Sequence, residues 1–328
     1  MTMLSNNSAT ARAHTNIALV KYWGKKDDKL ILPYTGSLSL TLDKFYTETT
    51  VTFNEQLTND EFYLNSQVQD SAATKKVSRF IDIVRNMAGE SRFAKVQSTN
   101  HVPTAAGFAS SASAMAALAG ATSKAAGLAL TPTELSILAR KGSGSACRSI
   151  FGGFVEWLPG VDDHSSHAVQ VDDANLTDIN VIALTVNANQ KKVSSRQEMK
   201  TTVDTSPFYN EWPQIVSRDL TDIKLAIKDD DFTRFGQISE SNALKMHALT
   251  MGATPPFTYF EPKTIEIMNQ VNQLRTNGIE CYFTIDAGPN VKILSRSNNV
   301  TKIAAAFTDL IGAANINVAK AGPGIEIL

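Results

Sequence analysis

Five groups of polar residues in this sequence have types and spacings suited to holding and changing an anionic ligand. The first is Lys21 with Tyr22, followed by Lys25, at the end of an apolar run. Because Lys21 comes directly after Ala18-Leu19-Val20, its ammonium is predicted to lie at the edge of a core. Two lysines beside a turn are, on their own, more typical of a solvated surface.

The second group is a glycine-serine segment that ends in an arginine, Gly142-Ser143-Gly144-Ser145-Ala-Cys-Arg148. Hydroxyl and backbone N–H groups can hold phosphate oxygens, and a guanidinium offers a planar fork to a carboxylate or a phosphate. The structural alternative is a helix C-cap followed by a turn, which suits Gly142. That alternative explains one glycine only, so we favour anion binding by Ser143, Ser145 and Arg148.

The third and fourth groups lie in the second half of the chain. Asp286 closes an apolar strand predicted over 279–286 and precedes a glycine-proline turn. A carboxylate in that place is often functional, although it can also cap the turn. The stretch 191–199 is basic and contains Ser195 and Arg196. By itself it is typical of an exposed loop.

The fifth group is a glycine loop leading into a helix of small residues, Pro103-Thr-Ala-Ala-Gly107-Phe-Ala-Ser110-Ser111-Ala-Ser113. Ser110 or Ser111 can cap this helix, which is predicted to run through Gly127. A helix N-terminus collects free N–H groups and the positive end of the macrodipole, so it suits a phosphate. The Gly-Lys-Ser/Thr ending of a Walker loop is missing. Taken alone, the stretch is more typical of an alanine-rich core helix.

Residue patterns predict the elements that position these groups. Strands are expected over 13–20, 37–42, 47–53, 93–102, 152–157, 179–186, 279–286, 291–295 and 324–328. Further helices are expected over 72–87, 131–141, 208–228, 231–249, 262–277 and 300–312. Strands and helices without strict alternation indicate an α+β fold in both halves. A polar stretch before 179 places the boundary between two domains, 1–178 and 179–328.

Composition narrows the class of protein. A chain of 328 residues with 43% apolar content and a net charge of −1 favours a soluble two-domain protein with neither nucleic acid nor membrane as partner. Its cysteines, Cys147 and Cys281, have no metal-ligand spacing, which favours a cytoplasmic location. The five histidines have no zinc-like spacing either. His247 could lie near a site, but a core or helix-surface role is at least as expected.

Taken together, and in this order along the chain, segments 16–25, 103–113, 142–149 and 286–290 resemble the GHMP small-molecule kinase superfamily. Within it they resemble the mevalonate diphosphate decarboxylase family, because Asp-Ala-Gly-Pro-Asn at 286–290 is typical of the decarboxylases. The likeness covers essentially the whole chain. It implies a ribosomal-protein-S5-like N-terminal domain and a ferredoxin-like C-terminal domain, with the active site in the cleft between them.

The resemblance also implies roles for individual residues. Asp286 would orient, and could deprotonate, a tertiary hydroxyl that lies near Lys21, while Arg148 would hold the carboxylate that leaves as CO₂. Ser195 would contact the substrate beside them. The remaining substrate contacts, mostly to a diphosphate, would come from Tyr22, Lys25, Ser143, Gly144, Ser145 and Arg196.

ATP is the second ligand that the resemblance implies. Its phosphates would contact the glycine loop and the start of the helix, namely Pro103, Ala105, Ala106, Gly107, Ala109, Ser110 and Ser111. Ser111 is also a candidate contact to Mg²⁺. The implied reaction is ATP-dependent decarboxylation of (R)-5-diphosphomevalonate to isopentenyl diphosphate, with release of CO₂, ADP and phosphate, in a homodimer.

Two other functions stay open at this point. One is a kinase of the same superfamily that stops at the phosphorylated intermediate. The other is a non-catalytic protein that binds a phosphate ligand, against which the presence of Lys21, Arg148 and Asp286 argues. Small departures from the family pattern, Phe108 and the stretch 34–36, touch none of the charged groups.

Overall fold

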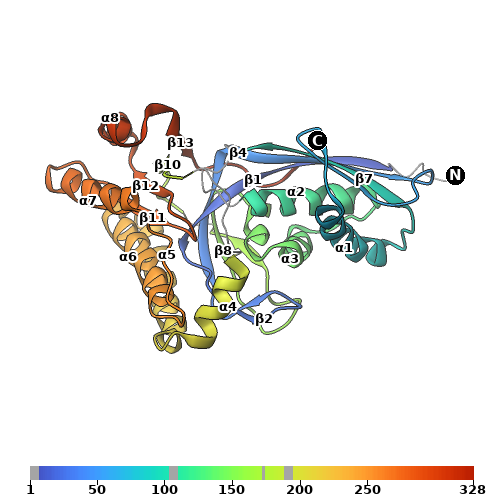
Figure 1. Ribbon diagram of the computed structural model, residues 1–328, viewed down its shortest axis with the longest axis horizontal. Helices are drawn as coiled ribbons and strands as arrows, with labels where there is room; N and C mark the ends of the chain where they lie inside the picture. Colours follow the sequence, from blue (N-terminus) through green and yellow to red (C-terminus); the bar gives the residue numbers. More distant parts are fainter. Residues whose placement is uncertain (1–6, 103–109, 172–173, 188–194) are drawn as a thin grey trace.

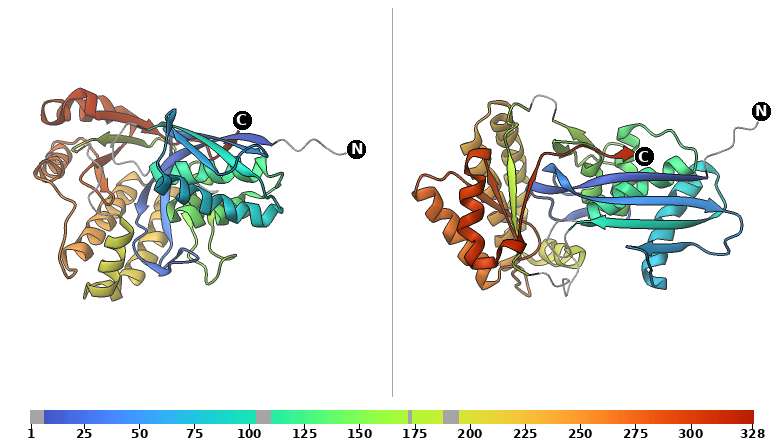
Figure 2. Two further views of the ribbon diagram at one scale, coloured as in Figure 1. Left: turned by 45° about the vertical axis from the view of Figure 1, so that its right-hand side comes forward. Right: turned by 90° about the horizontal axis from the view of Figure 1, so that it is seen from above.

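The computed structural model describes residues 7–102, 110–171, 174–187 and 195–328. It has two parts, each built on its own β-sheet (Figure 1). In the larger part, three helices lie on one face of an eight-stranded sheet, and in the smaller part helices pack on a four-stranded sheet (Figures 1 and 2). The predicted two-domain α+β fold is confirmed.

The larger sheet has the order β14-β1-β4-β7-β5-β6, with β8 beside β4 and β9 beside β8. Its strands are β1 (Ser8–Val20), β4 (Ser37–Asn54), β5 (Glu61–Leu64), β6 (Gln67–Val68), β7 (Phe93–His101), β8 (Phe154–Trp157), β9 (Ala168–Gln170) and β14 (Glu326–Ile327). All neighbours are antiparallel except β5 and β7. The long strands β1 and β4 run side by side and carry the ends of the sheet toward the smaller part (Figure 1).

The prediction of two separate strands over 37–42 and 47–53 is wrong, because β4 is continuous. The register between β1 and β4 shifts between His14 and Asn16, which pair with Tyr46 and Thr41 respectively. This bulge takes up the intervening charged residues of β4 without ending the ladder. Asp43 and Lys44 therefore lie at an irregularity within one strand.

The helices that cover the larger sheet are α1 (Ser71–Ala88), α2 (Ser110–Ala125) and α3 (Pro132–Gly142). Helix α2 is buried along most of its length, as its small residues predicted. Its capping stays a prediction, because the residue before Ser110 lies outside the described part of the chain. Helix α3 begins with a capping box, in which Thr131 and Glu134 satisfy each other's backbone N–H groups.

The smaller sheet is antiparallel throughout and has the order β11-β12-β10-β13. Its strands are β10 (Asn180–Leu184), β11 (Tyr282–Ile285), β12 (Val291–Ser295) and β13 (Ile316–Lys320). Its helices are α4 (Ser195–Thr205), α5 (Trp212–Lys228), α6 (Phe232–Met251), α7 (Pro262–Thr276) and α8 (Val300–Ile311). The sequence β10, helices, β11, β12, α8, β13 is the β-α-β-β-α-β pattern of ferredoxin-like domains.

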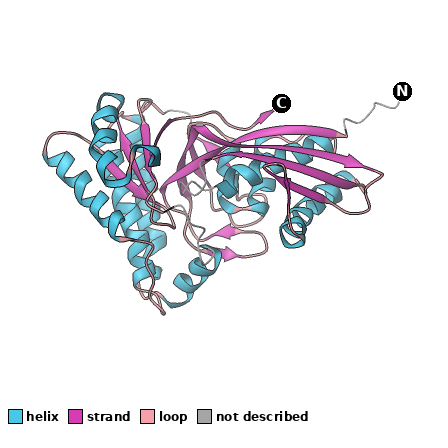
Figure 3. Cartoon of the chain, turned by 45° about the horizontal axis from the view of Figure 1, so that its top comes forward, coloured by secondary structure: helices cyan, strands magenta, loops and turns pink. Residues whose placement is uncertain are grey.

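Several elements, β5 and β6 among them, differ from the sequence prediction, and so do three more, namely α4, β13 and a small hairpin. Residues 195–199 belong to helix α4 rather than to an exposed loop, and β13 was not predicted. Residues 25–33, where no strand was predicted, contain a small hairpin of β2 (Lys25–Asp27) and β3 (Leu32–Pro33), which lies near α4 (Figure 3). All three are short and mostly polar or half-buried, so a hydrophobic period could not reveal them.

The last strand of the chain returns to the first sheet. β14 pairs with β1, and on the way the Gly322 N–H donates to the Thr41 carbonyl at 2.8 Å. The division into 1–178 and 179–328 therefore describes where most residues pack, and as a domain boundary it stays a prediction. Within the described residues, each helix is too short or too polar to cross a lipid bilayer.

Candidate active site

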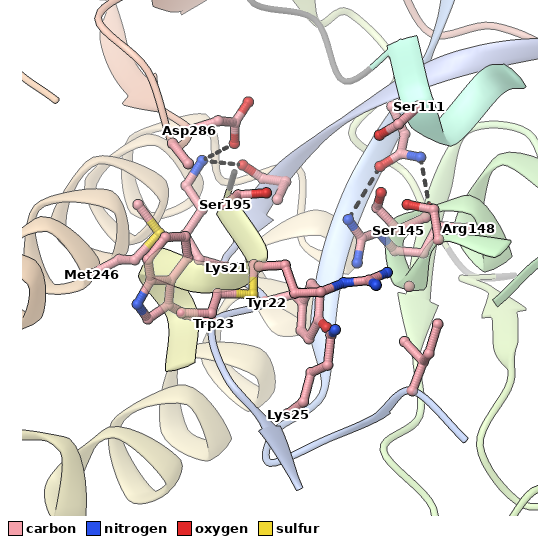
Figure 4. A pocket seen from close by; sticks show the side chains of 18 residues that line it. Lys21, Tyr22, Trp23, Lys25, Ser111, Ser145, Arg148, Ser195, Met246 and Asp286 are labelled. Carbon is pink, nitrogen blue, oxygen red and sulfur yellow. Dashed lines mark hydrogen bonds and ion pairs between the residues drawn. The ribbon is translucent and has the colours of Figure 1, made fainter. Parts of the chain in front are cut away.

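A cavity of about 280 Å³ lies where the two parts meet (Figure 4). Eleven residues predicted from the sequence line it, namely Lys21, Tyr22, Lys25, Ser111, Ser143, Gly144, Ser145, Arg148, Ser195, Arg196 and Asp286. Asp286 and Lys21 lie at one side in this view, and Arg148, Ser145 and Ser111 lie at the other (Figure 4). The structure thus gathers side chains from β1, α2, α4 and the second sheet into a single crevice.

Part of the predicted ATP loop cannot be placed. Pro103, Ala105, Ala106, Gly107 and Ala109 lie outside the described residues. Ser110 opens α2, and Ser111, in the same first turn, lines the cavity. The positive end of α2 therefore faces the crevice.

Two buried lysines hold the carboxylate of Asp286. The Lys21 Nζ donates to Asp286 Oδ1 at 2.8 Å, and the Lys292 Nζ donates to Asp286 Oδ2 at 3.2 Å. Burial raises the pKa of Asp286, but the two ammonium groups outweigh that effect and hold the pKa well below the usual range of an aspartate. Asp286 is therefore an ionised, weakly basic group whose two oxygens are each oriented.

Residues of the smaller part hold the chain in place at the end of β1. The Lys21 backbone N–H donates to Asn242 Oδ1 at 2.8 Å, and Asn242 in turn donates to Asp219 at 2.7 Å. The Tyr209 hydroxyl donates to the Trp23 carbonyl at 2.8 Å. These contacts fix the backbone at Lys21 and thereby set the direction of its side chain.

Gly24, the next residue, has a backbone conformation that favours glycine. Its φ is +100°, and a Cβ there would lie 1.9 Å from the Tyr209 Oη. A side chain at this position would displace the tyrosine. Glycine thus allows the second part to approach the backbone beside Lys21 and Tyr22.

Arg148 is buried and has no anionic partner among the residues that the structure describes. It lies in a 3₁₀ turn, Gly144–Ile150, and its guanidinium donates to Ser37 Oγ at 2.6 Å and to Asn16 Oδ1 at 3.2 Å. Its Nε is buried without a hydrogen-bond partner, and no carboxylate of the described residues is within ion-pair distance. Burial lowers the pKa of Arg148. A buried, partly unsatisfied cation of this kind is suited to an anionic ligand.

The wall beside Arg148 is built from aromatic and glycine residues. The rings of Tyr22 and Trp157 pack at a centroid distance of 4.7 Å, and the Tyr22 hydroxyl is buried with no partner among the described residues. A Cβ on Gly144 would lie 2.8 Å from Trp157 and 3.1 Å from Tyr22. Glycine at 144 therefore brings the backbone close to both rings and leaves the phenol free for a ligand.

Two further cationic side chains, those of Lys25 and Arg196, line the cavity. Ser195 and Arg196 form the first turn of α4, and Lys25 extends from the hairpin opposite. Lys25 pairs with Asp28 at 3.2 Å, and burial above all, then Arg196, lowers the pKa of Lys25. The prediction that 195–199 belongs to a loop was wrong, yet the helix still presents both predicted residues to the cavity.

Sequence reasoning missed three polar residues that shape the site. Lys292 is a charged residue inside the buried strand β12, and Asn16 is an amide in the apolar run of β1; each is a signal that could have been used. Asn242 gives no such signal, since its role depends on a contact between α6 and β1. His247 is a core residue packed against Phe260 at a ring distance of 4.4 Å.

The described residues offer few side chains that could bind Mg²⁺ directly. Among the residues that the structure describes, no three His, Cys, Asp or Glu side chains are grouped to hold a metal ion. Mg²⁺ that accompanies a nucleotide is usually bound by phosphate oxygens and water with one or two protein oxygens. Ser111 in the first turn of α2 fits such a contact.

Family models match both halves of the chain. A diphosphomevalonate decarboxylase-like N-terminal domain matches residues 13–168, and a mevalonate 5-diphosphate decarboxylase C-terminal domain matches residues 181–323. The diphosphomevalonate decarboxylase of Schizosaccharomyces pombe is 35% identical over 96% of this chain and 88% of its own. The human diphosphomevalonate decarboxylase is 33% identical over 91% of this chain and 79% of its own.

Solved structures agree with these matches. Mevalonate diphosphate decarboxylase from Staphylococcus aureus is 48% identical, with a TM-score of 0.95 and 98% of each chain covered. The enzyme from Enterococcus faecalis is 50% identical, with a TM-score of 0.93 and the same coverage. A structure of MDDEF in complex with MVAPP, AMPPCP and magnesium is 51% identical, with a TM-score of 0.94 and 98% of each chain covered.

With both halves matched in order and one crevice joining the predicted groups, the chain belongs to the diphosphomevalonate decarboxylase family of the GHMP kinase superfamily.

Proposed function

We propose that this protein catalyses the ATP-dependent decarboxylation of (R)-5-diphosphomevalonate to isopentenyl diphosphate, with release of CO₂, ADP and phosphate, in the mevalonate pathway of isoprenoid biosynthesis. One observation carries the proposal. Arg148, a buried cation without a carboxylate partner among the described residues, shares a cavity with the ionised Asp286. A carboxylate to be lost and a hydroxyl to be phosphorylated thus have separate, complementary contacts.

The substrate is held at three places. Arg148 takes the carboxylate, and the free Tyr22 hydroxyl faces the diphosphate together with Lys25 and the serines of segment 143–145. Ser195 and Arg196 of α4 make the third set of contacts to the substrate. Three anchors on one small molecule fix the tertiary hydroxyl beside Asp286, which is the positioning that phosphoryl transfer requires.

Asp286 acts in this scheme mainly as an orienting acceptor. The hydroxyl donates a hydrogen bond to the carboxylate, its oxygen bonds to the γ-phosphorus, and the bond from that phosphorus to the ADP oxygen breaks. A carboxylate paired with two ammonium groups is a weak base, so the hydroxyl keeps its proton until the new bond forms, and the proton then passes to an oxygen of the transferred phosphoryl group. Lys21 lies next to the transferred group and stabilises its charge.

Decarboxylation follows from the phosphorylated alcohol. The bond between C3 and the phosphate oxygen breaks. The electrons of the bond between C2 and the carboxylate carbon form the new C=C bond between C2 and C3, and CO₂ departs. Positive charge builds at C3 in this step, and the Asp286 carboxylate is the nearest anion of the site to offset it. Phosphate leaves as an anion into a cavity that is lined by Lys21.

ATP binds with its phosphates at the N-terminus of α2, where Ser110 and Ser111 lie, and along the loop of Pro103, Ala105, Ala106, Gly107 and Ala109. Mg²⁺ bound with the nucleotide, with Ser111 as its contact from this chain, offsets the charge of the phosphates. A homodimer and a cytoplasmic location belong to the same proposal. Both rest on the family, and the two free, buried cysteines support the second.

The test is a coupled assay with mevalonate 5-diphosphate carrying a labelled carboxyl group. We expect ADP and CO₂ in equal amounts, and we expect neither product when ATP or mevalonate 5-diphosphate is left out. A kinase that stops at the intermediate would form ADP without CO₂. A non-catalytic binding protein would form neither, and either result would refute the proposal.

A further inference from the structure

The carboxylate of Asp286 is shared by two lysines that come from different elements. Lys21 directly follows β1 in the larger part, whereas Lys292 lies inside β12 in the smaller part. Each ammonium bonds a different oxygen, at 2.8 and 3.2 Å. Both lysines are only 1% exposed. The family roles considered above include Lys21 but leave Lys292 without a function.

The position of Lys292 is an unusual one for a charge. It is flanked in β12 by buried Val291 and Ile293, and across the sheet it pairs with Ala183 of β10 and Thr284 of β11. Removing an ammonium from water into such a strand is costly unless a close anion compensates. The Asp286 carboxylate supplies that anion, and a strand position is rigid enough to orient it.

We propose that Lys292 is a positioning residue for Asp286, which fixes the Oδ2 atom so that Oδ1 remains directed toward Lys21 and the cavity. This inference rests on the proposed function, because it concerns the orientation of the group that accepts the substrate hydroxyl. It extends that function by assigning a role to a residue of the second sheet that does not itself line the cavity.

The charges around Asp286 show what its second lysine adds. Lys21 faces it from β1, Lys292 from β12 and Arg148 from the 3₁₀ turn, while His247 faces it from α6. Lys21 is the direct ion-pair partner of one carboxylate oxygen. Lys292 adds a second positive charge at the other oxygen, so the carboxylate stays ionised and is ready to accept a hydrogen bond without taking the proton.

The test compares Lys292→Met with the wild type and with Lys302→Met, the same exchange at an exposed position of α8. Lys292→Met leaves Asp286 paired one to one with Lys21, so no carboxylate is left uncompensated. Turnover and the ¹³C carboxyl titration of Asp286 are measured, with Asp286→Asn used to assign the resonance. Lys292→Gln serves as a second neutral variant if the first does not fold.

For Lys292→Met we expect kcat to fall on the order of tenfold with the substrate KM within about twofold, because orientation is lost rather than binding. The titration midpoint of Asp286 should rise by about 1–3 pH units, while Lys302→Met changes neither quantity. An unchanged midpoint in both neutral variants would overturn the proposal even if kcat falls. Failure of the proposed function is seen separately, as a wild type that forms no CO₂ while the titration is still measurable.

Discussion

Replacing Arg148 with glutamine should weaken substrate binding far more than it slows the bound substrate. The guanidinium is buried, and the described residues offer it no carboxylate, so the substrate carboxylate is its expected partner. Truncating one member of a buried charge pair costs about 2–5 kcal/mol. At about 1.4 kcal/mol for each factor of ten, binding should weaken by about 30- to 4,000-fold.

The loss should appear in KM rather than in kcat. The carboxylate loses its charge as CO₂ forms, so the pair with Arg148 is stronger in the bound substrate than in the transition state for decarboxylation. Removing an interaction of the ground state raises KM without an equal fall in kcat.

The stability of the ligand-free protein should change little in Arg148→Gln. The variant loses the costly burial of an unpaired charge, and it also loses bonds to Ser37 and Asn16 that an amide can replace in part. We expect the two effects to cancel to within about 1 kcal/mol.

The assay combines steady-state release of ADP and CO₂ with calorimetric titration of mevalonate 5-diphosphate and a thermal melt. Arg218→Gln, an exchange at an exposed position of α5, is the matched control and should behave as the wild type. If kcat falls in Arg148→Gln while KM and the calorimetric Kd stay unchanged, Arg148 does not hold the carboxylate and the reasoning is refuted.

Three further predictions concern other parts of the site. Asp286→Asn should lower kcat by about a hundredfold or more while mevalonate 5-diphosphate still binds by calorimetry, because the charge that orients the hydroxyl is lost; near-normal turnover would remove Asp286 from the mechanism. Gly144→Ala should raise KM and lower the melting temperature, since the added Cβ would lie 2.8 Å from Trp157; kinetics and a melt like those of the wild type would contradict the tight wall. The pKa of His247 is lowered to about 3 from 6.5 by burial above all, then by Lys21, so the unfolded chain binds a proton in that window that the folded protein does not. The free energy of unfolding should therefore drop by about 2 kcal/mol between pH 7 and pH 5 from this group, and His247→Leu should show a correspondingly smaller difference in denaturant melts; an equal difference in both proteins would argue against it.

Local features of the fold were predictable from the sequence, and features made by distant contacts were not. The start of α3 is visible in Thr131, Pro132 and Glu134, because the cap is closed within one turn. β4 is continuous because a bulge takes up residues 42–45 within its ladder with β1, a feature of the strand pairing that the sequence of β4 does not reveal. Helix α4 lacks a clear apolar face and has Thr202 as its one buried residue among those described, which explains why it resembled a loop.

The residues of the site divide in the same way, into those that a local pattern reveals and those whose role depends on a distant contact. Lys21, Arg148 and Asp286 stand next to glycine turns or at strand ends, where a charged residue is conspicuous. Asn242 gives no sign of its role, since the contact that matters joins α6 to the backbone of Lys21 across the two parts. Lys292 did give a sign, as a charge within an apolar strand, and only its partner was hidden.

The pairing of β14 with β1 has a consequence for how the protein is made. β14 follows β1 in the chain only after the whole of the smaller part, so the nascent larger sheet lacks this strand until the smaller part has been synthesised. Until then the N–H and C=O groups of β1 beside Ala11 and Arg12 remain open to pairing with other chains. Chains that stall before residue 326 keep this edge open and are therefore exposed to aggregation during synthesis.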